Sequence, residues 1–218
     1  YDPKKITDHT RFLEKRAVVF TEGGHDMGNL LVGYGANYKQ RMQTLLEEQP
    51  ELFGLVDGKR LPAGNFAGTS QPCTSNPMTL QKMLENCIER IQNACGEREN
   101  IRSFCNDDHT TWCLCENCLK LDSPLENNSF NRRSTRWWHF VNFMAKGILD
   151  SGKCPYTRIS TLAYQNFRMP PAGITPDPRV SVGIAPHQRC YLHPLDDPSC
   201  SVNADKFREL FEAWHRAG

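Results

Sequence analysis

The clearest hydrophobic pattern in the chain predicts an amphipathic helix over residues 76–96. Asn76 is a favoured N-cap residue, and Pro77 suits the first helical position because that N–H has no helical partner. Apolar residues then recur at spacings of three and four until Gly96, which is typical of a helix end. The predicted buried face comprises Leu80, Met83, Leu84, Cys87, Ile88, Ile91 and Cys95.

Similar apolar stripes predict helices over residues 38–49, over residues 131–149 and from Asn203 onward. Between the helices lie five short apolar runs, which predict strands: Ala17–Phe20, Phe53–Val56, Ile101–Cys105, Ile159–Tyr164 and Val180–Ile184. Alternating strands and helices favour an α/β fold with a parallel sheet. Five strands are fewer than a closed barrel needs. We therefore expect residues 1–218 to form one domain, an incomplete (β/α) TIM-barrel-like segment with its helices outside.

Charge and composition narrow the possible partners. The 218 residues include 26 Lys and Arg against 25 Asp and Glu, and no basic block, so nothing favours nucleic acid as a partner. Mean hydropathy is −0.59 and no apolar run is long enough for a membrane span. No Gly-x-Gly-x-x-Gly fingerprint, Walker phosphate loop or Gly-x-Ser-x-Gly elbow occurs.

In an α/β barrel, reactive groups lie where strands end. That rule selects residues 22–26, 106–109, 165–168 and 186–189. Asp107 and Asp108 are the candidate catalytic residues, because a carboxyl that is partly desolvated in a cleft can stay protonated and act as a general acid. Capping of a turn or helix is the alternative, since Asn-Asp-Asp is also common turn chemistry.

Aromatic and polar side chains near these strand ends suit a sugar, whose apolar face stacks on rings and whose hydroxyls bind amides and carboxylates. The candidate substrate-binding residues are His25, Asn106, Trp112, Tyr164, Asn166 and His187. Packing roles for Trp112 and Tyr164, and a loop-fixing role for His187, stay open. Gly23-Gly24 before His25 predicts a close backbone approach, either to a ligand or to another loop.

The chain has ten cysteines, and Cys113-x-Cys115-x-x-Cys118 is their most distinctive arrangement. Three thiolates this close can bind Zn²⁺, with Cys105, His109 or Cys73 as a fourth ligand. Disulfides or plain structural thiols are the first interpretation and structural zinc is the alternative; we expect no required cofactor. A disulfide between Cys113 and Cys115 is disfavoured by geometry. We predict that the three sulfurs lie together beside the strand end that carries Asp107 and Asp108.

Several longer stretches share a family resemblance: Gln49–Arg60, Gln71–Pro77, Asp108–Cys118, Thr161–Tyr164 with Pro170-Pro171 following, and His193–Asp197. They resemble an uncharacterised bacterial family of domains of unknown function, numbered 4838, and Asp108–Cys118 is the most specific stretch. The resemblance implies a glycoside-hydrolase-type (β/α) barrel, distantly similar to α-glucuronidases and β-hexosaminidases. In the related hexosaminidases a mid-barrel strand ends in Asp-Glu, and the comparable position here is Asp107-Asp108.

These observations lead to one functional hypothesis with two alternatives. The leading hypothesis is a glycoside hydrolase-like protein that acts on an oligo- or polysaccharide, with Asp108 as the acid and Asp107 or an acid elsewhere as the second carboxyl. The alternatives are a non-catalytic carbohydrate-binding barrel and a zinc-stabilised interaction domain. The chain begins with Tyr1, as a fragment or a protein without its signal peptide would, and we expect a secreted or periplasmic location.

Overall fold

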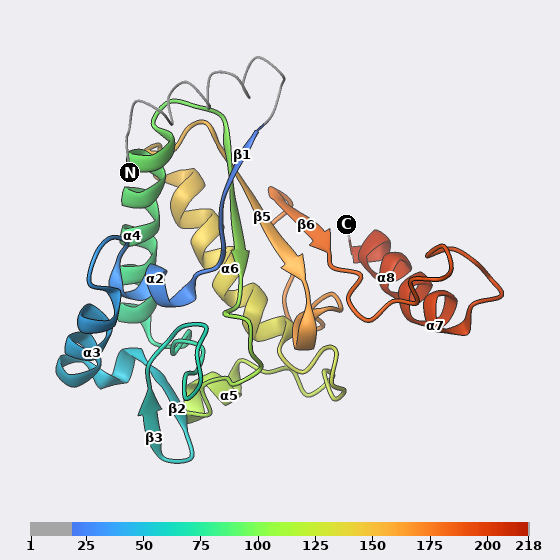
Figure 1. Ribbon diagram of the computed structural model, residues 1–218, viewed down its shortest axis with the longest axis horizontal. Coiled ribbons are helices and arrows are strands. Elements are labelled where there is room, and N and C mark those ends of the chain that lie inside the picture. Colours follow the sequence, from blue (N-terminus) through green and yellow to red (C-terminus); the bar gives the residue numbers. More distant parts are fainter. Residues whose placement is uncertain (1–18, 218) are drawn as a thin grey trace.

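A parallel sheet of four strands forms the centre of the computed structural model, which describes residues 19–217 (Figure 1). The strands are β1 (Phe20–His25), β4 (Asn100–Cys105), β5 (Thr157–Ala163) and β6 (Val180–Ile184). They lie side by side in the order β1-β4-β5-β6, and every neighbouring pair is parallel. All four strands therefore end at the same edge of the sheet. The predicted α/β class is confirmed, and the open parallel sheet is consistent with an incomplete barrel.

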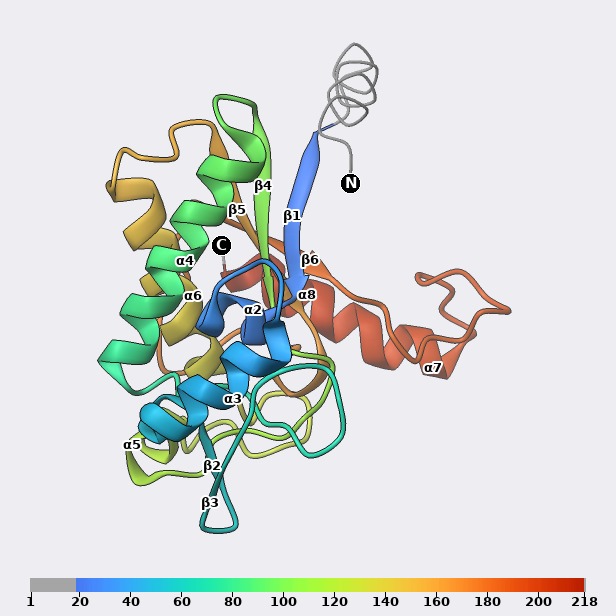
Figure 2. The ribbon, with the colours of Figure 1, turned by 60° about the vertical axis from the view of Figure 1, so that its left-hand side comes forward.

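Two long helices connect the strands and cover one face of the sheet. Helix α4 (Pro77–Cys95) precedes β4, and α6 (Ser134–Asp150) lies between β4 and β5. Figure 2 shows both helices on the same side of the sheet. Phe104 of β4 packs edge-to-face against Phe140 of α6, with ring centroids 5.7 Å apart. The main hydrophobic core lies between this face and the helices.

Helix α4 follows its sequence signals closely. The Asn76 side chain accepts a hydrogen bond from the Met78 N–H at 2.9 Å, and Gly96 ends the helix with a positive φ of 57°. Cys87 and Cys95 are buried, as predicted, and both carry free thiols. Helix α6 begins later than predicted. The Asn131 side chain instead accepts a hydrogen bond from the Asn128 N–H at 3.0 Å, within a turn before the helix.

The predicted strand over Phe53–Val56 does not join the parallel sheet, so that expectation is corrected. Residues Gly54–Val56 form β2, which pairs antiparallel with β3 (Lys59–Leu61) in a separate hairpin. Asp57 and Gly58 connect the two strands, and both have positive φ, 48° and 76°. An Asp-Gly pair of this conformation is a strong hairpin signal, because its twist matches that of the paired strands.

Five further helices before β6 are shorter than α4 and α6. They are α2 (Met27–Val32), α3 (Tyr38–Glu48), η1 (Pro50–Leu52), α5 (Glu116–Lys120) and η2 (Gln165–Phe167). Helix α3 was predicted, whereas α2 and α5 were not. Each of those two is only one to two turns long, which is too short to show a helical periodicity.

Strand β1 differs from the predicted run Ala17–Phe20, of which Ala17 and Val18 lie outside the described residues. The strand extends to His25 through two glycines with positive φ, 96° at Gly23 and 123° at Gly24. A Cβ atom at Gly23 would lie 2.3 Å from the carbonyl oxygen of Ser103 on β4. The close backbone approach predicted here is therefore to a neighbouring strand.

The chain ends in a helical segment built from α7 (Ser201–Asn203), the π-helical turn η3 (Ala204–Arg208) and α8 (Glu209–Ala217). The segment starts two residues before the predicted Asn203. Trp214 of α8 packs against Trp138 of α6 and donates a hydrogen bond to the carbonyl oxygen of Arg168 at 2.8 Å. No helix in the described part of the chain has both the length and the apolar character to cross a membrane.

Candidate functional site

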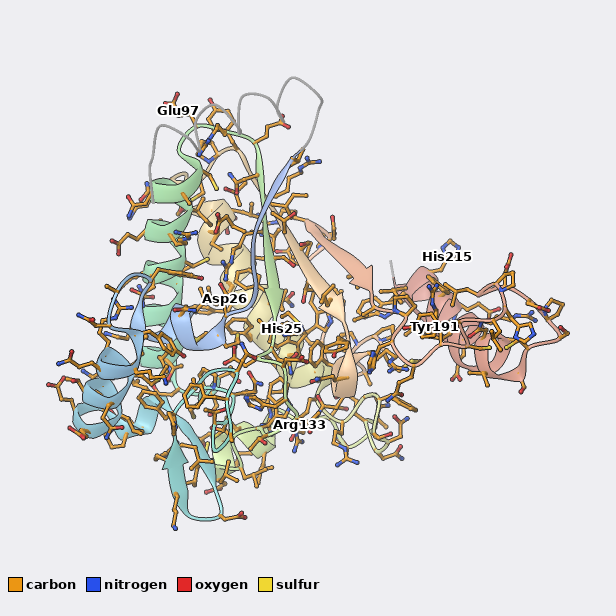
Figure 3. The ribbon with its side chains drawn as sticks, viewed as in Figure 1. His25, Asp26, Glu97, Arg133, Tyr191 and His215 are labelled. Atoms are coloured by element: carbon orange, nitrogen blue, oxygen red, sulfur yellow. The ribbon has the colours of Figure 1, made fainter. Side chains whose placement is uncertain are left out.

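The ends of the four parallel strands bring several predicted residues to one edge of the sheet. His25 ends β1, Tyr164 follows β5 and His187 follows β6. The Tyr164 ring lies between the two histidines, with centroids 6.0 Å from His25 and 5.9 Å from His187. Figure 3 shows His25 at the end of β1. This aromatic row is the centre of the candidate site.

Asp108 opens onto the same edge. Its carboxylate is exposed, and Oδ1 accepts hydrogen bonds from the Tyr164 hydroxyl and the Gln165 side-chain amide, both at 3.2 Å. Its backbone N–H donates to the side-chain oxygen of Asn65. Partial burial, together with the negative charge of Asp108, raises the pKa of Tyr164, so this hydroxyl stays protonated and donates. Two side chains thus fix the carboxylate beside the aromatic row, and Asn65 fixes the backbone of Asp108.

Asp107 has a different environment from its neighbour. Its side chain is 1% exposed, and Oδ1 accepts hydrogen bonds from the Met27 N–H at 3.1 Å and the Asn65 amide at 3.4 Å. The Gln71 side chain accepts a hydrogen bond from the Asp107 backbone N–H and donates one to the Asp107 carbonyl oxygen. Burial, reinforced by the charge of Asp26, raises the pKa of Asp107 to about 6. Asp107 therefore caps α2 from inside the fold, as the capping alternative proposed, and does not face the open edge.

Asn106 supports the site from beneath. It is fully buried, and its side-chain amide donates to the carbonyl oxygen of His109 at 2.9 Å and to Oε1 of Gln165 at 2.8 Å. Its own carbonyl oxygen lies 2.5 Å from Nδ1 of His25. Asn106 thus orients a histidine and an amide of the site.

Trp112 and Asn166, also predicted to bind substrate, are both largely buried. Trp112 is 3% exposed, and its ring packs against Trp137 and Phe167 with centroids 6.2 and 6.1 Å away. That position matches the packing alternative. Asn166 is 6% exposed, and its backbone carbonyl oxygen accepts a hydrogen bond from the Arg133 N–H at 2.9 Å.

Two open cavities flank the aromatic row and share Tyr164 and His187. The first has a volume of about 470 Å³ and is also lined by Thr110, Ser129, Phe130, Arg132, Arg133, Gln165, Asn166, Arg168 and Gln188. The second has a volume of about 400 Å³ and is also lined by His25, Leu162, Ala185, Pro186, Arg189 and Tyr191. Each volume falls within the usual range for a small-ligand site. Figure 3 labels Arg133, which lines the first cavity, and Tyr191, which lines the second.

Three residues of the site were not predicted: Asn65, Gln71 and Gln165. Gln165 lies within the strand-end segment 165–168, so the topological rule pointed to its position but not to its role. Asn65 and Gln71 come from the loop that follows β3, about 40 residues before Asp107 in the chain. No local sequence pattern reveals such long-range hydrogen bonds.

A second feature lies below this edge of the sheet: a cluster of four cysteines, Cys73, Cys113, Cys115 and Cys118. All four Sγ atoms lie within 4.8 Å of one another, and Cys73 Sγ is 3.7 Å from Cys115 Sγ and 3.8 Å from Cys118 Sγ. A tetrahedral zinc site with Zn–S bonds of about 2.3 Å has sulfur–sulfur edges of about 3.8 Å. The cluster therefore has the ligands and the spacing that a metal ion requires.

The surroundings of the cluster add hydrogen bonds to the sulfurs. The Leu55 N–H donates to Cys113 Sγ at 3.2 Å, and the Ser75 hydroxyl lies 3.1 Å from Cys118 Sγ. Such outer contacts orient the ligands of a metal site. Of the predicted fourth ligands, Cys73 joins the cluster. Cys105 instead contacts Asn106, and His109 contacts Thr69 and Gln71.

The predicted grouping of Cys113, Cys115 and Cys118 is confirmed, and Gln71 connects it to the strand end. Gln71 lies two residues before Cys73, its side chain bonds the Asp107 backbone, and its N–H donates to the carbonyl oxygen of Thr111 at 2.9 Å. The cluster and Asp107 are thus joined through one short loop.

Comparison with known proteins identifies one family. The model of the family described as a domain of unknown function (DUF4838) matches residues 20–217. Searches among curated proteins and among solved structures found no match. Because the family model covers nearly all of the sequence, the chain belongs to the DUF4838 family.

Proposed function

We propose that the carboxyl edge of the sheet binds a glycan, and that the protein is a glycoside hydrolase-like enzyme acting on an oligo- or polysaccharide. The observation that carries this proposal is the Tyr164 ring, which lies between two histidines while its hydroxyl donates to the exposed Asp108 carboxylate. The exposed aromatic edge suits the apolar face of a sugar. The carboxylate and the Gln165 amide suit its hydroxyls.

Asp108 is the carboxyl that we assign to the chemistry. It follows β4 at the carboxyl edge of the sheet and accepts a hydrogen bond from Tyr164, which lines both cavities. Its hydrogen bonds to Tyr164, Gln165 and Asn65 hold it in place. In this role the protonated form of Asp108 donates its proton to the glycosidic oxygen as the bond to the anomeric carbon breaks, and water supplies the hydroxyl that this carbon gains. Its placement at a strand end matches the usual position of reactive groups in barrels.

A second candidate function is glycan binding without turnover. Hydrolysis uses two carboxyls, about 5–5.5 Å apart for retention of configuration or about 6.5–9.5 Å apart for inversion. Neither of the two cavities is lined by a carboxylate from the described residues, and Asp107 is occupied in capping α2. This observation favours a binding module.

A glycoside screen with the intact protein separates the two functions. We expect wild type to hydrolyse at least one glycoside class and Asp108→Asn to lower kcat by about 10²–10⁴-fold. Asp57→Asn, in the exposed hairpin turn, is the matched control and should leave the rate unchanged. Glycan binding without hydrolysis would establish the binding module. Neither binding nor hydrolysis across the screen would refute both functions.

We also propose that the four-cysteine cluster holds a structural zinc ion. The sulfur spacing and the N–H···S contact from Leu55 support this proposal. Four protein ligands would leave no open coordination position, so the ion would stabilise the fold and would not take part in chemistry. It would join the loop before α4 to the loop after β4. A zinc-stabilised interaction domain is the corresponding alternative to glycan turnover.

A secreted or periplasmic location is part of the same proposal. Fractionation of the native host, followed by immunodetection of the protein, tests this location. Recovery in the cytoplasmic fraction alone would contradict it.

A further inference from the structure

A second group of metal-ligating side chains lies between β6 and α7, and none of its members lines either cavity of the candidate site. Its members are Cys190, His193 and Cys200, whose ligand atoms all lie within 4.8 Å of one another. Cys190 Sγ is 3.2 Å from Nδ1 of His193. We propose that these three residues form a second metal site, for Zn²⁺ or a similar borderline-soft divalent cation.

The loop that carries the three residues is built around a buried amide. Asn203 is 0% exposed, and its Oδ1 accepts a hydrogen bond from the Cys190 N–H at 2.8 Å. Its Nδ2 lies 3.0 Å from the carbonyl oxygens of Cys190, His193 and Pro194. One side chain thus fixes the backbone at two of the three ligands, and the third, Cys200, lies three residues before it.

A further turn brings Cys200 back to the other two ligands. Asp197 Oδ1 accepts hydrogen bonds from the Ser199 N–H at 2.8 Å and the Ser199 hydroxyl at 2.6 Å. The Cys200 N–H in turn donates to the carbonyl oxygen of Asp197 at 3.2 Å. The approach of the three ligands is therefore specified by the local backbone, as a metal site requires.

The ligand set distinguishes this site from the four-cysteine cluster. Two thiolates and one imidazole leave one position of a tetrahedron for water or another small ligand. His193 is exposed, so that position opens to solvent. A disulfide between Cys190 and Cys200 is the rival use of the two thiols, but it gives no role to the imidazole beside them.

The proposed metal site lies next to the second cavity of the candidate functional site. Arg189 and Tyr191, on either side of Cys190, both line the cavity that contains His25 and Tyr164. The Arg189 guanidinium also lies over the Tyr191 ring at 4.7 Å. Metal binding would therefore order one wall of that cavity. The inference rests on the three ligands and their loop alone, so it stands or falls independently of glycan binding.

Metal analysis of the intact protein, purified with a thiol reductant and without chelators, tests the site. We expect two equivalents of zinc in wild type and one in His193→Ala and in Cys200→Ser. Cys118→Ser, which removes a ligand from the four-cysteine cluster, should also retain one equivalent. The Cys118→Ser/His193→Ala double variant should bind none.

Cobalt substitution provides the second measurement. It leaves Cys190, His193 and Cys200 unchanged, so it does not require a variant of the proposed second site to fold. Cys118→Ser loaded with Co²⁺ should show the visible d–d bands of a tetrahedral site together with a thiolate charge-transfer band. Unchanged zinc content in both His193→Ala and Cys200→Ser would overturn the proposal. A Cys190–Cys200 disulfide in protein purified from its native host would overturn it as well; it would be detected as a 2 Da lower mass of the proteolytic peptide that contains these two cysteines alone.

Discussion

The Oδ1 atom of Asp107 lies 3.1 Å from the backbone nitrogen of Met27, so a carboxylate that follows β4 caps the helix that follows β1. Helix α2 needs this distant cap because the carboxylate of Asp26, its N-cap residue, is held by Arg102 at 3.0 Å. Asp107 and Asp108 are adjacent in sequence and have separate roles. The Asp107 carboxyl caps a helix inside the fold, and the Asp108 carboxyl is exposed at the carboxyl edge of the sheet.

The raised pKa of Asp107 predicts a specific dependence of stability on pH. Its pKa is about 6 in the folded protein and about 3.9 in an unfolded chain, so the folded state binds this proton more tightly. This carboxyl therefore favours folding most below about pH 4, and its contribution falls as pH rises to about 6. The loss is about 3 kcal/mol.

Asp107→Asn tests that dependence, because an amide does not titrate but can still accept from the Met27 N–H. We expect the free energy of unfolding of the variant, relative to wild type, to rise by up to about 3 kcal/mol between pH 4 and pH 7 in urea titrations. Asp57→Asn, which alters an exposed carboxylate, should show no such trend. A difference that is the same at every pH would show that Asp107 is not perturbed by burial.

The ion pair between Arg102 and Asp26 gives a second prediction. The Arg102 side chain is fully buried, and Asp26 is its carboxylate partner at 3.0 Å. Asp26→Ala would leave a buried, unpaired guanidinium, and such a change costs about 3–5 kcal/mol. Chemical denaturation measures the loss. Lys146→Ala removes the exposed pair with Asp150 and should change stability far less. Equal losses in the two variants would contradict the assigned role of burial.

Removal of metal from the four-cysteine cluster should destabilise the fold. A ligand that binds only the folded state adds about 4 kcal/mol when its free concentration is 1,000 times its Kd. We therefore expect chelation of zinc, or Cys118→Ser, to lower the melting temperature by several degrees. Cys95→Ser, at a buried thiol outside both metal-ligand groups, is the control and should not change the response to chelator. A wild-type melting temperature that is insensitive to chelator would count against structural zinc.

The sequence predicted those parts of the fold that depend on local patterns. Helix α4 could be placed because Asn76, Pro77, Gly96 and the apolar stripe all act within one segment. The Asp57-Gly58 hairpin also had a local signal, but we interpreted the flanking apolar run as a strand of the parallel sheet. Apolar content alone does not distinguish a central strand from a hairpin strand.

The parts that escaped prediction depend on contacts between distant segments. Helix α2 is capped by Asp107, 80 residues later, and α6 is capped by the buried carboxylate of Glu126, which accepts from the Thr135 N–H. In the site, the topological rule located Asp108, and Tyr164 was predicted as an aromatic residue near a strand end, but no sequence pattern predicted their mutual hydrogen bond. Trp112 was a candidate substrate-binding residue but lies in the core. The sequence did not distinguish the two positions, because an aromatic residue near a strand end fits either.

The central claim is that Asp108 and Tyr164 together bind a glycan, and a double-mutant cycle measured by titration calorimetry tests it most directly. The glycan is the best binder from the screen, and the variants are Asp108→Asn, Tyr164→Phe and their combination. A hydrogen bond to a charged group contributes about 1.5–3 kcal/mol, so Asp108→Asn should raise Kd by about 10- to 100-fold. The Kd of the double variant should be at most about threefold higher than that of Asp108→Asn alone, because the two side chains share one hydrogen bond. Affinities within twofold of wild type in all three variants would contradict the claim.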